Sequence, residues 1–238
     1  MNLVIDIGNT LVKIAVFDKE TLIDKYTDTI LNISTINYYI QKYEIRHGII
    51  STVRENNYNM SEISNHIKLI ILDTNTRIPI QNLYETPHTL GRDRIAAAVG
   101  GWSMFPNKKL LIIDIGTAIT YDYVSEAGEF LGGNISPGIT LRYKSLYEFT
   151  GKLPYITPAN NYPLFGVSTE TAIRSGVQTG IVNEINSYIC AFMEHYPAGI
   201  VIISGGDVKF IADKIKNNSI FEPELVLKGL NSILQYNE

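Results

Sequence analysis

The same short acidic motif ends two separate apolar runs of this chain. The copies are Val4–Thr10 and Ile112–Ala118, and their aspartates, Asp6 and Asp114, lie 108 positions apart (114 − 6). In each copy a glycine follows two positions after the aspartate and lets a tight turn approach a ligand closely. Backbone N–H groups in such a turn bind anions, and a carboxylate suits such a site when Mg²⁺ lies between it and phosphate oxygens. The duplication therefore predicts two phosphate-and-metal loops that face one nucleotide across a cleft.

Apolar runs outside these motifs predict strands that alternate with helices. Short runs rich in β-branched residues are typical of strands, and apolar positions at helical spacing are typical of helices. The expected strands are Leu3–Ile7, Leu11–Phe17, Leu22–Thr27, His47–Thr52, Lys68–Leu72, Leu110–Asp114, Ile119–Val124, Phe130–Leu131 and Gly199–Ile203. The expected helices are Ile33–Tyr43, Ser61–His66, one after Gly91, Ile139–Phe149, Thr169–Glu194, one after Asp207 and one, preceded by a strand, near Glu224–Gln235. This alternation favours an α/β fold.

The order strand, strand, strand, helix occurs twice, and each time it opens with the acidic motif. We therefore predict a duplication with one domain at residues 1–85 and a second at residues 86–238. The boundary falls in a polar, Pro-containing connection at residues 74–90. Because no Gly/Ser-rich linker or charge block separates the halves, we expect the two domains to pack tightly.

The bulk composition excludes several classes of protein. The chain has 238 residues, of which 45% are hydrophobic, so it can bury a sizeable core. A net charge of −4 argues against general nucleic-acid binding, which needs clustered Lys and Arg. The single cysteine, Cys190, expected on the apolar face of a helix, excludes an internal disulfide and fits a reducing cytoplasm. No signal peptide is visible at the start, and no apolar stretch reaches the ~18 residues that a membrane span needs.

Four motifs, taken in order, make the chain resemble a known family. They are Asp6–Thr10 with Lys13, Gly91–Arg94, Asp114–Ala118 and Gly132–Gly138. The two acidic loops resemble the phosphate loops of acetate and sugar kinases, heat-shock chaperones and actin. All four motifs together, in their order and spacing, resemble type III pantothenate kinase. Within the second motif, arginine stands at position 92, where the family usually has a small residue, and its added positive charge can alter the affinity for an anionic substrate.

The resemblance implies a fold, a reaction and an assembly. The fold is a pair of ribonuclease H-like domains of the actin-like ATPase type, with mixed sheets and a nucleotide cleft between them. The reaction is the ATP-dependent phosphorylation of the primary hydroxyl of pantothenate, the first step toward coenzyme A. The resemblance also implies Mg²⁺ or another divalent metal with ATP, a monovalent cation (K⁺ or NH₄⁺), and a homodimer.

The resemblance assigns the nucleotide side of the site to the acidic loops. Asp6 is expected to organise Mg²⁺, directly or through water, and Lys13 to reach the β or γ phosphate as a point charge. From the residues alone, a solvated strand lysine fits position 13 equally well. The ATP-binding set is Asp6, Ile7, Gly8, Asn9, Thr10, Leu11, Val12, Lys13 and Thr117. Asp114 matches the monovalent-cation ligand of the family, whereas the residues alone favour a Mg²⁺ role like that of Asp6.

The resemblance assigns the acceptor side to the Gly91–Arg94 motif and two outlying residues. Asp93 is the expected general base, and it is strong enough because positioning dominates phosphoryl transfer. Without the family, an N-cap aspartate is the simpler interpretation. The pantothenate-binding set is Tyr84, Gly91, Arg92, Asp93, Arg94 and Thr169. In the family this threonine comes from the partner subunit, although a helix cap at Ser168 or Thr169 also fits the residues.

Glycines outside the acidic loops are expected near the cleft. The set is Gly132, Gly133 and Gly138, with Gly205–Gly206 near the adenosine, and plain turns explain them nearly as well. Three other functions stay open: a kinase for another small acceptor, a noncatalytic regulatory relative that affects gene expression, and an actin-like filament or chaperone ATPase. The Gly91–Arg94 motif argues against the first, the intact Asp6, Asp93 and Asp114 against the second, and the short chain against the third.

Overall fold

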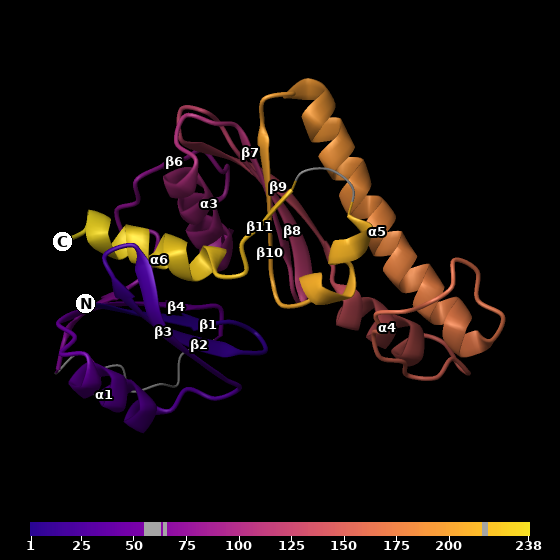
Figure 1. Cartoon of the computed structure of the whole chain (residues 1–238), viewed down its shortest axis with the longest axis horizontal. Coiled ribbons are helices and arrows are strands. Elements are labelled where there is room, and N and C mark those ends of the chain that lie inside the picture. Colours follow the sequence, from indigo (N-terminus) through magenta and orange to yellow (C-terminus); the bar gives the residue numbers. More distant parts are fainter. Residues whose placement is uncertain (55–62, 64–65, 216–218) are drawn as a thin grey trace. The chain divides into compact units, whose positions relative to one another are not determined.

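The computed structural model describes residues 1–54, 63, 66–215 and 219–238 (Figure 1). These residues form two compact units. Unit 1 contains Met1–Asn107, Val124–Leu131 and Glu224–Glu238, and unit 2 contains Lys108–Tyr123 and Gly132–Pro223. Unit 1 thus extends beyond residue 85, and the duplicated domains at residues 1–85 and 86–238 stay a prediction. The expected helix Ser61–His66 lies outside the described residues except for two of its positions.

Unit 1 is built on a five-stranded mixed sheet with the order β3-β2-β1-β4-β5. Its strands are β1 (Asn2–Ile7), β2 (Val12–Asp18), β3 (Thr21–Asp28), β4 (His47–Thr52) and β5 (Lys68–Ile71). The pairs β1–β2 and β2–β3 are antiparallel, and β1–β4 and β4–β5 are parallel. Every residue of β1 is buried, as expected of a central strand covered on both faces. Because β1 and β4 are parallel, their carboxyl ends meet at one edge of the sheet.

Helices cover this sheet and complete the core of unit 1. Helix α1 (Ile33–Lys42) buries Ile36, Tyr39 and Ile40 in the same apolar cluster as β1 and β2. Helix α6 (Leu225–Tyr236) packs on α3 (Arg92–Met104) and on β1, and Figure 1 shows it, in yellow, beside both. A Cβ atom at Gly229 would lie 1.8 Å from the Ala96 carbonyl oxygen, so the two helices approach as closely as a glycine permits.

Unit 2 contains most of a second mixed sheet, in the order β11-β10-β7-β8-β9. The strands are β7 (Leu110–Ile115), β8 (Ala118–Val124), β9 (Glu129–Pro137), β10 (Ile200–Ser204) and β11 (Ile220–Phe221). The strand β10 runs parallel to both β7 and β11. The first residues of β9 belong to unit 1, where they pair in parallel with β6 (Gln81–Asn82).

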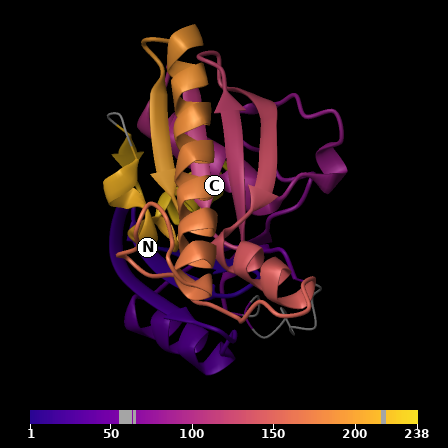
Figure 2. The ribbon, with the colours of Figure 1, turned by 90° about the vertical axis from the view of Figure 1, so that its right-hand side faces the viewer.

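Two helices follow in unit 2, α4 (Ile139–Glu148) and α5 (Thr169–His195). Figure 2 shows α5 lying lengthwise along the sheet, and its buried Ile181, Ile185 and Ile189 share one core with β7 and β10. Cys190, expected in this core, is exposed, because it lies one position past the buried stripe. In the part of the chain that the structure describes, no helix is long and apolar enough to cross a membrane.

Most predicted elements are present, two differ, and two short elements, β6 and Pro87–Thr89, are absent from the prediction. The strand predicted at Phe130–Leu131 continues as β9 to Pro137, so Gly132 and Gly133 are strand residues rather than a turn. A Cβ atom at Gly133 would lie 1.9 Å from the Tyr121 carbonyl oxygen, and glycine is therefore what lets β9 lie against β8. The helix expected after Asp207 is two short 3-10 segments, Val208–Phe210 and Ala212–Lys214. A 3-10 turn, Pro87–Thr89, interrupts the connection before α3.

Candidate active site

The first acidic loop joins β1 to β2 in unit 1. Asp6, the second-to-last residue of β1, is 9% exposed and pairs in register with Lys13 of β2 and Ser51 of β4. The Gly8 N–H donates to the Leu11 carbonyl over 2.9 Å and closes a tight turn. Ile7 and Val12 are buried, whereas the tip at Asn9, Thr10 and Leu11 is exposed. The loop thus anchors a carboxylate at the end of a buried strand and presents an exposed backbone turn, the geometry that a phosphate loop requires.

The turn after β4 holds this loop in place. The Val53 N–H donates to the Ile7 carbonyl over 3.1 Å and extends the β1–β4 ladder by one residue. The Arg54 guanidinium then donates through Nε to the Gly8 carbonyl over 2.7 Å and through Nη2 to the Asn9 carbonyl over 3.2 Å. Sequence reasoning missed Arg54, because its place beside the first loop depends on β4 running parallel to β1, which the sequence pattern does not reveal.

The Gly91–Arg94 motif, here called the acceptor motif, lies at the start of α3. Gly91 is the N-cap residue and Asp93 lies inside the first turn, so the interpretation of Asp93 as an N-cap residue is wrong. Asp93 is half-buried, and its Oδ1 accepts a hydrogen bond from the Arg94 backbone N–H over 2.9 Å. The Arg94 guanidinium is buried and lies 5.5 Å from the centre of the Tyr84 ring and 5.8 Å from that of Phe130. These cation–π contacts fix Arg94 beside the expected base and explain why Tyr84 stands near it.

Arg92 connects the acceptor motif to the turn after β4. Its Nη1 donates to the Thr52 carbonyl over 3.2 Å, so this departure from the family pattern has a structural partner at the end of β4. A cavity of about 620 Å³ in unit 1 lies at this junction, within the size range of ligand pockets. Its lining includes Thr52, Arg54, Leu72, Asn82, Gly91 and Arg92. The structure thus brings Gly91 and Arg92 of the acceptor motif and the turn that holds the first acidic loop around one cavity, whereas Asp93, Arg94 and Tyr84 are not among its described lining residues.

The residues of the first loop fit a divalent metal that is shared with a nucleotide. Among the residues that the structure describes, no group of three or more His, Cys, Asp or Glu side chains forms a complete metal cage. Mg²⁺ needs no such cage, because it keeps several waters and binds one or two carboxylates together with substrate phosphates. Asp6, at the start of an exposed glycine turn, is a donor of this kind.

The second acidic loop joins β7 to β8 in unit 2. The Gly116 N–H donates to the Ala118 carbonyl over 3.0 Å, which closes a turn one residue shorter than that of the first loop, where Gly8 bonds to Leu11. The Gly138 N–H donates to the Thr117 carbonyl over 3.0 Å, and Gly205, with a φ of +104°, packs its backbone on Ile115. Two of the predicted glycines, Gly138 and Gly205, therefore contact this loop. Burial raises the pKa of the nearby Asp207 carboxyl above its usual value, and Lys209 partly offsets the effect.

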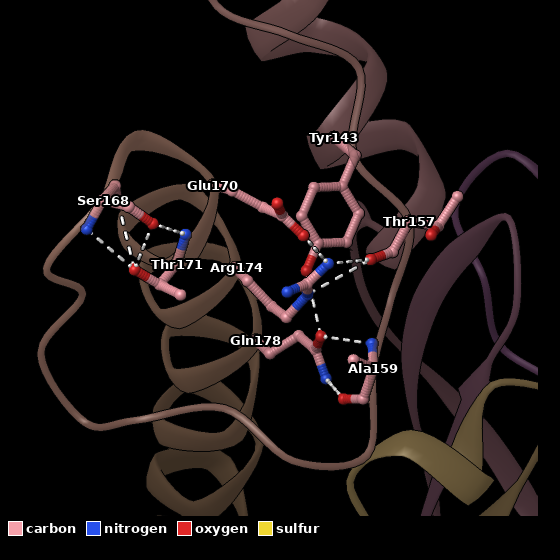
Figure 3. Close-up of polar contacts among 8 residues, drawn as sticks. All are labelled: Tyr143, Thr157, Ala159, Ser168, Glu170, Thr171, Arg174 and Gln178. Atoms are coloured by element: carbon pink, nitrogen blue, oxygen red, sulfur yellow. Dashed lines mark hydrogen bonds and ion pairs between the residues drawn. The ribbon is translucent and has the colours of Figure 1, made fainter.

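Thr169 is the first residue of α5 and is exposed. Ser168 is the N-cap residue and forms a capping box with Thr171, as Figure 3 shows. The wholly buried Gln178 side chain forms two hydrogen bonds with the backbone of Ala159. Its Oε1 accepts from the Ala159 N–H over 3.1 Å, and its Nε2 donates to the Ala159 carbonyl over 2.9 Å. This paired contact anchors the segment before α5 to the helix that begins at Thr169.

Two α/β units, each with a buried strand that ends in an acidic glycine loop, define the class of proteins with the actin-like ATPase and sugar kinase fold. Solved structures agree with this class. A candidate N-acetylmannosamine kinase from Listeria monocytogenes superposes with a TM-score of 0.57 at 15% identity, covering 100% of this chain and 99% of that chain. A candidate Baf family transcriptional activator from Campylobacter jejuni superposes with a TM-score of 0.64 at 25% identity, covering 99% and 98% of the two chains.

Sequence comparisons narrow the class to one family. A family profile described as Type III pantothenate kinase matches residues 2–191. A protein of that name from Bacteroides fragilis is 44% identical over 239 residues, which cover 100% of this chain and 98% of the relative. The chain belongs to the type III pantothenate kinase family, whose members phosphorylate pantothenate in coenzyme A biosynthesis. The resemblance and the fold class predicted from the four motifs are thereby confirmed.

Proposed function

We propose that this chain transfers the γ-phosphoryl group of ATP to the primary hydroxyl of pantothenate, giving 4′-phosphopantothenate and ADP. The observation that carries the assignment of residues is the turn Thr52–Arg54. It is hydrogen-bonded to the first acidic loop through Arg54 and to the acceptor motif through Arg92. Groups suited to bind phosphates and groups suited to bind the acceptor are therefore held by one connected piece of unit 1.

On the nucleotide side, the first acidic loop binds the ATP phosphates. Asp6 would hold the divalent metal, which when bound would offset the charge of the phosphates. Lys13 is the cross-strand neighbour of Asp6 and adds a positive charge beside the loop. The proposed ATP-binding residues are Asp6, Ile7, Gly8, Asn9, Thr10, Leu11, Val12, Lys13 and Thr117.

On the acceptor side, Asp93 is the general base. A carboxylate has about four lone-pair positions, so the bond that Asp93 accepts from Arg94 leaves capacity for the pantothenate hydroxyl. Arg94, held by Tyr84, offers a planar fork to a carboxylate or to the transferring phosphoryl group. Because the transition state of phosphoryl transfer is loose, these residues act mainly by alignment and charge.

The second acidic loop supplies the remaining proposed site residues, Asp114 and Thr117. Asp114 binds a monovalent cation, K⁺ or NH₄⁺, and Thr117 contributes to ATP binding. The resemblance of Asp114–Ala118 to the family motif supports the cation assignment, and the hydrogen-bonded turn at Gly116 places Asp114 and Thr117 in one loop.

We also propose that the chain acts as a homodimer in which Thr169 of one subunit completes the acceptor site of the other. Exposed apolar side chains just before α5 support this. Phe165 is 80% exposed and Val167 is 96% exposed, and apolar side chains gathered at a surface mark interaction sites. The single cysteine supports the cytoplasm as the place of the reaction, and the net charge of −4 supports small-molecule rather than nucleic-acid ligands.

The test is an ADP-release assay with purified protein, ATP and Mg²⁺, with and without pantothenate, in potassium and in sodium buffer. We expect ADP release that requires pantothenate and is higher in potassium. Folded protein that binds ATP without pantothenate-dependent turnover would overturn the proposed reaction. Turnover that is equal in both buffers would overturn the cation assignment alone.

The similarity to a candidate transcriptional activator favours one alternative, a regulatory relative that binds ligands without turnover. Such a protein would bind ATP or pantothenate and release no ADP, so the same assay distinguishes it.

A further inference from the structure

Arg54 follows β4 by two positions and faces the first acidic loop. Its guanidinium donates to three backbone carbonyls, those of Gly8, Asn9 and Thr29, over 2.7, 3.2 and 3.4 Å. The turn that carries Arg54 is itself closed by Thr52, because the Arg54 N–H donates to Thr52 Oγ1 over 3.1 Å. The base of the side chain is thus fixed, and its donors are aimed at the loop.

These contacts determine which way the loop presents its N–H groups. In a trans peptide the carbonyl of one residue points opposite to the N–H of the next, and the described chain contains no cis peptide bond. The carbonyls of Gly8 and Asn9 point toward Arg54. The N–H groups of Asn9 and Thr10 therefore point to the opposite side, where successive backbone N–H groups make an anion site.

The same contacts strengthen those N–H groups as donors. A hydrogen bond to a carbonyl polarises the whole peptide unit, so chains of hydrogen bonds reinforce one another. A charged donor such as guanidinium makes a stronger hydrogen bond than a neutral one. All three described partners of the Arg54 guanidinium are uncharged backbone carbonyls, so the charge acts on the loop through its peptide groups.

We propose that Arg54 is a positioning residue for the ATP phosphates: it orients and polarises the 8–9 and 9–10 peptide groups so that their N–H groups bind phosphate oxygens. The inference rests on the proposed function only in naming ATP as the ligand of this loop. It assigns to Arg54 a task that neither the acidic loop nor the acceptor motif performs for itself, namely holding the backbone of the loop in its anion-binding form.

The test compares Arg54→Gln and Arg54→Lys with Arg46→Gln. Arg46 is an exposed arginine at the opposite end of the same strand, so it controls for the loss of one charge near β4. Binding of the Mg²⁺ complex of a non-hydrolysable ATP analogue is measured by calorimetry without pantothenate, and thermal unfolding is recorded for each variant. The kcat and the KM for ATP and for pantothenate are then measured separately.

We expect Arg54→Gln to weaken analogue binding and raise the KM for ATP by about tenfold, the scale of one charge-assisted contact, while the KM for pantothenate changes less than about twofold. Lysine keeps the charge but lacks the fork, so Arg54→Lys should fall between Arg54→Gln and the wild type. Arg46→Gln should match the wild type.

Unchanged analogue binding in Arg54→Gln would overturn the proposal, as would an equal rise in both KM values together with a lower unfolding temperature. If Arg54→Gln does not fold, the Arg54→Lys variant decides on the same criteria. Wild-type protein that binds the analogue but never phosphorylates pantothenate would overturn the proposed function and leave the Arg54 comparison intact.

Discussion

At the residue scale, the sequence leaves two roles open for Asp93, a helix N-cap and a general base, and the structure excludes the first of them. Asp93 does not cap α3, since Gly91 holds that position, and its single described bond comes from the adjacent Arg94 N–H. The helix dipole stabilises a carboxylate in the first turn, and we propose that Asp93 in addition brings the pantothenate hydroxyl into line with the phosphate.

We predict that Asp93→Asn keeps the fold and the nucleotide affinity but lowers kcat by at least about a hundredfold, the lower end of what a general base contributes. Steady-state kinetics and analogue binding measure the two properties. Asp213→Asn, which alters an aspartate whose side chain is 75% exposed in unit 2, serves as the control and should behave like the wild type. Turnover of Asp93→Asn near the wild-type value would exclude Asp93 as the base.

The residues of this site differ in how far the sequence predicts them. Asp6, Gly8 and Asp93 belong to motifs whose order and spacing resemble those of the family, so the sequence predicts them through that resemblance. Arg54 has no such pattern: it is one arginine among polar residues after a strand. Its importance depends on β4 being parallel to β1, a long-range pairing that a single sequence does not show.

At the scale of elements, glycines determine how closely helices approach each other. Gly229 of α6 lies against the Ala96 carbonyl of α3, while Gly176 of α5 has no heavy atom within 4 Å of where a Cβ would stand. Both are helix-interior glycines, and alanine improves the intrinsic helix propensity at each by about 1 kcal/mol. Because a Cβ atom would meet backbone at Gly229 and open space at Gly176, the two substitutions by alanine differ only in packing.

We predict that Gly229→Ala lowers the free energy of unfolding by about 3 kcal/mol, because the new methyl group must push two packed helices apart. Gly176→Ala should raise it by ~0.5–1 kcal/mol. Denaturant unfolding of both variants provides the measurement. A Gly229→Ala protein as stable as the wild type would mean that α3 and α6 do not pack as described.

A second element-scale contact joins α4 and α5 to the sheet of unit 2. Glu184 of α5 accepts hydrogen bonds from Tyr121 over 2.7 Å, from Ser136 over 2.5 Å and from Arg142 over 2.5 Å. Burial by itself raises the pKa of Glu184, but the three hydrogen bonds outweigh it and hold the pKa below the ordinary value of 4.5. The charged form is therefore the one that the fold stabilises.

We predict that Glu184→Gln lowers the free energy of unfolding by ~1–2 kcal/mol at neutral pH. Because the folded pKa is depressed, the contribution of Glu184 is present above pH 4.5 and is lost as the pH falls through the folded pKa. Urea unfolding at several pH values should show the difference between wild type and variant shrinking below pH 4.5. A difference that stays constant into that range would contradict this account.

Strand and helix positions follow the apolar pattern closely, because buried parallel strands need continuous apolar runs. The failures have physical causes. Gly132 and Gly133 suggest a turn, yet strand β9 needs glycine to lie against β8. The strand β6 has two polar residues, Gln81 and Asn82, and exists only because β9 offers a paired edge.

At the scale of the whole molecule, the proposed dimer depends on the apolar segment before α5. We predict that Phe165→Asp converts a dimer to a monomer in sedimentation velocity and raises the KM for pantothenate while the fold of each subunit is kept. Tyr236→Asp, at a half-exposed tyrosine of unit 1, is the control for an added charge. A wild-type protein that sediments as a monomer at micromolar concentration would contradict the proposal.

The packing of α6 on β1 has a consequence for synthesis on the ribosome. Unit 1 contains both the first strand and the last helix, so residues 225–236 must leave the exit tunnel before its core can close. At about 5–20 residues per second, roughly 10–40 seconds separate the appearance of β1 from that of α6. Unit 2 is complete before that moment. The nascent chain is therefore expected to fold from its middle outward. Its first strands stay without α6 for the longest time, so they are where a chaperone has the most time to bind.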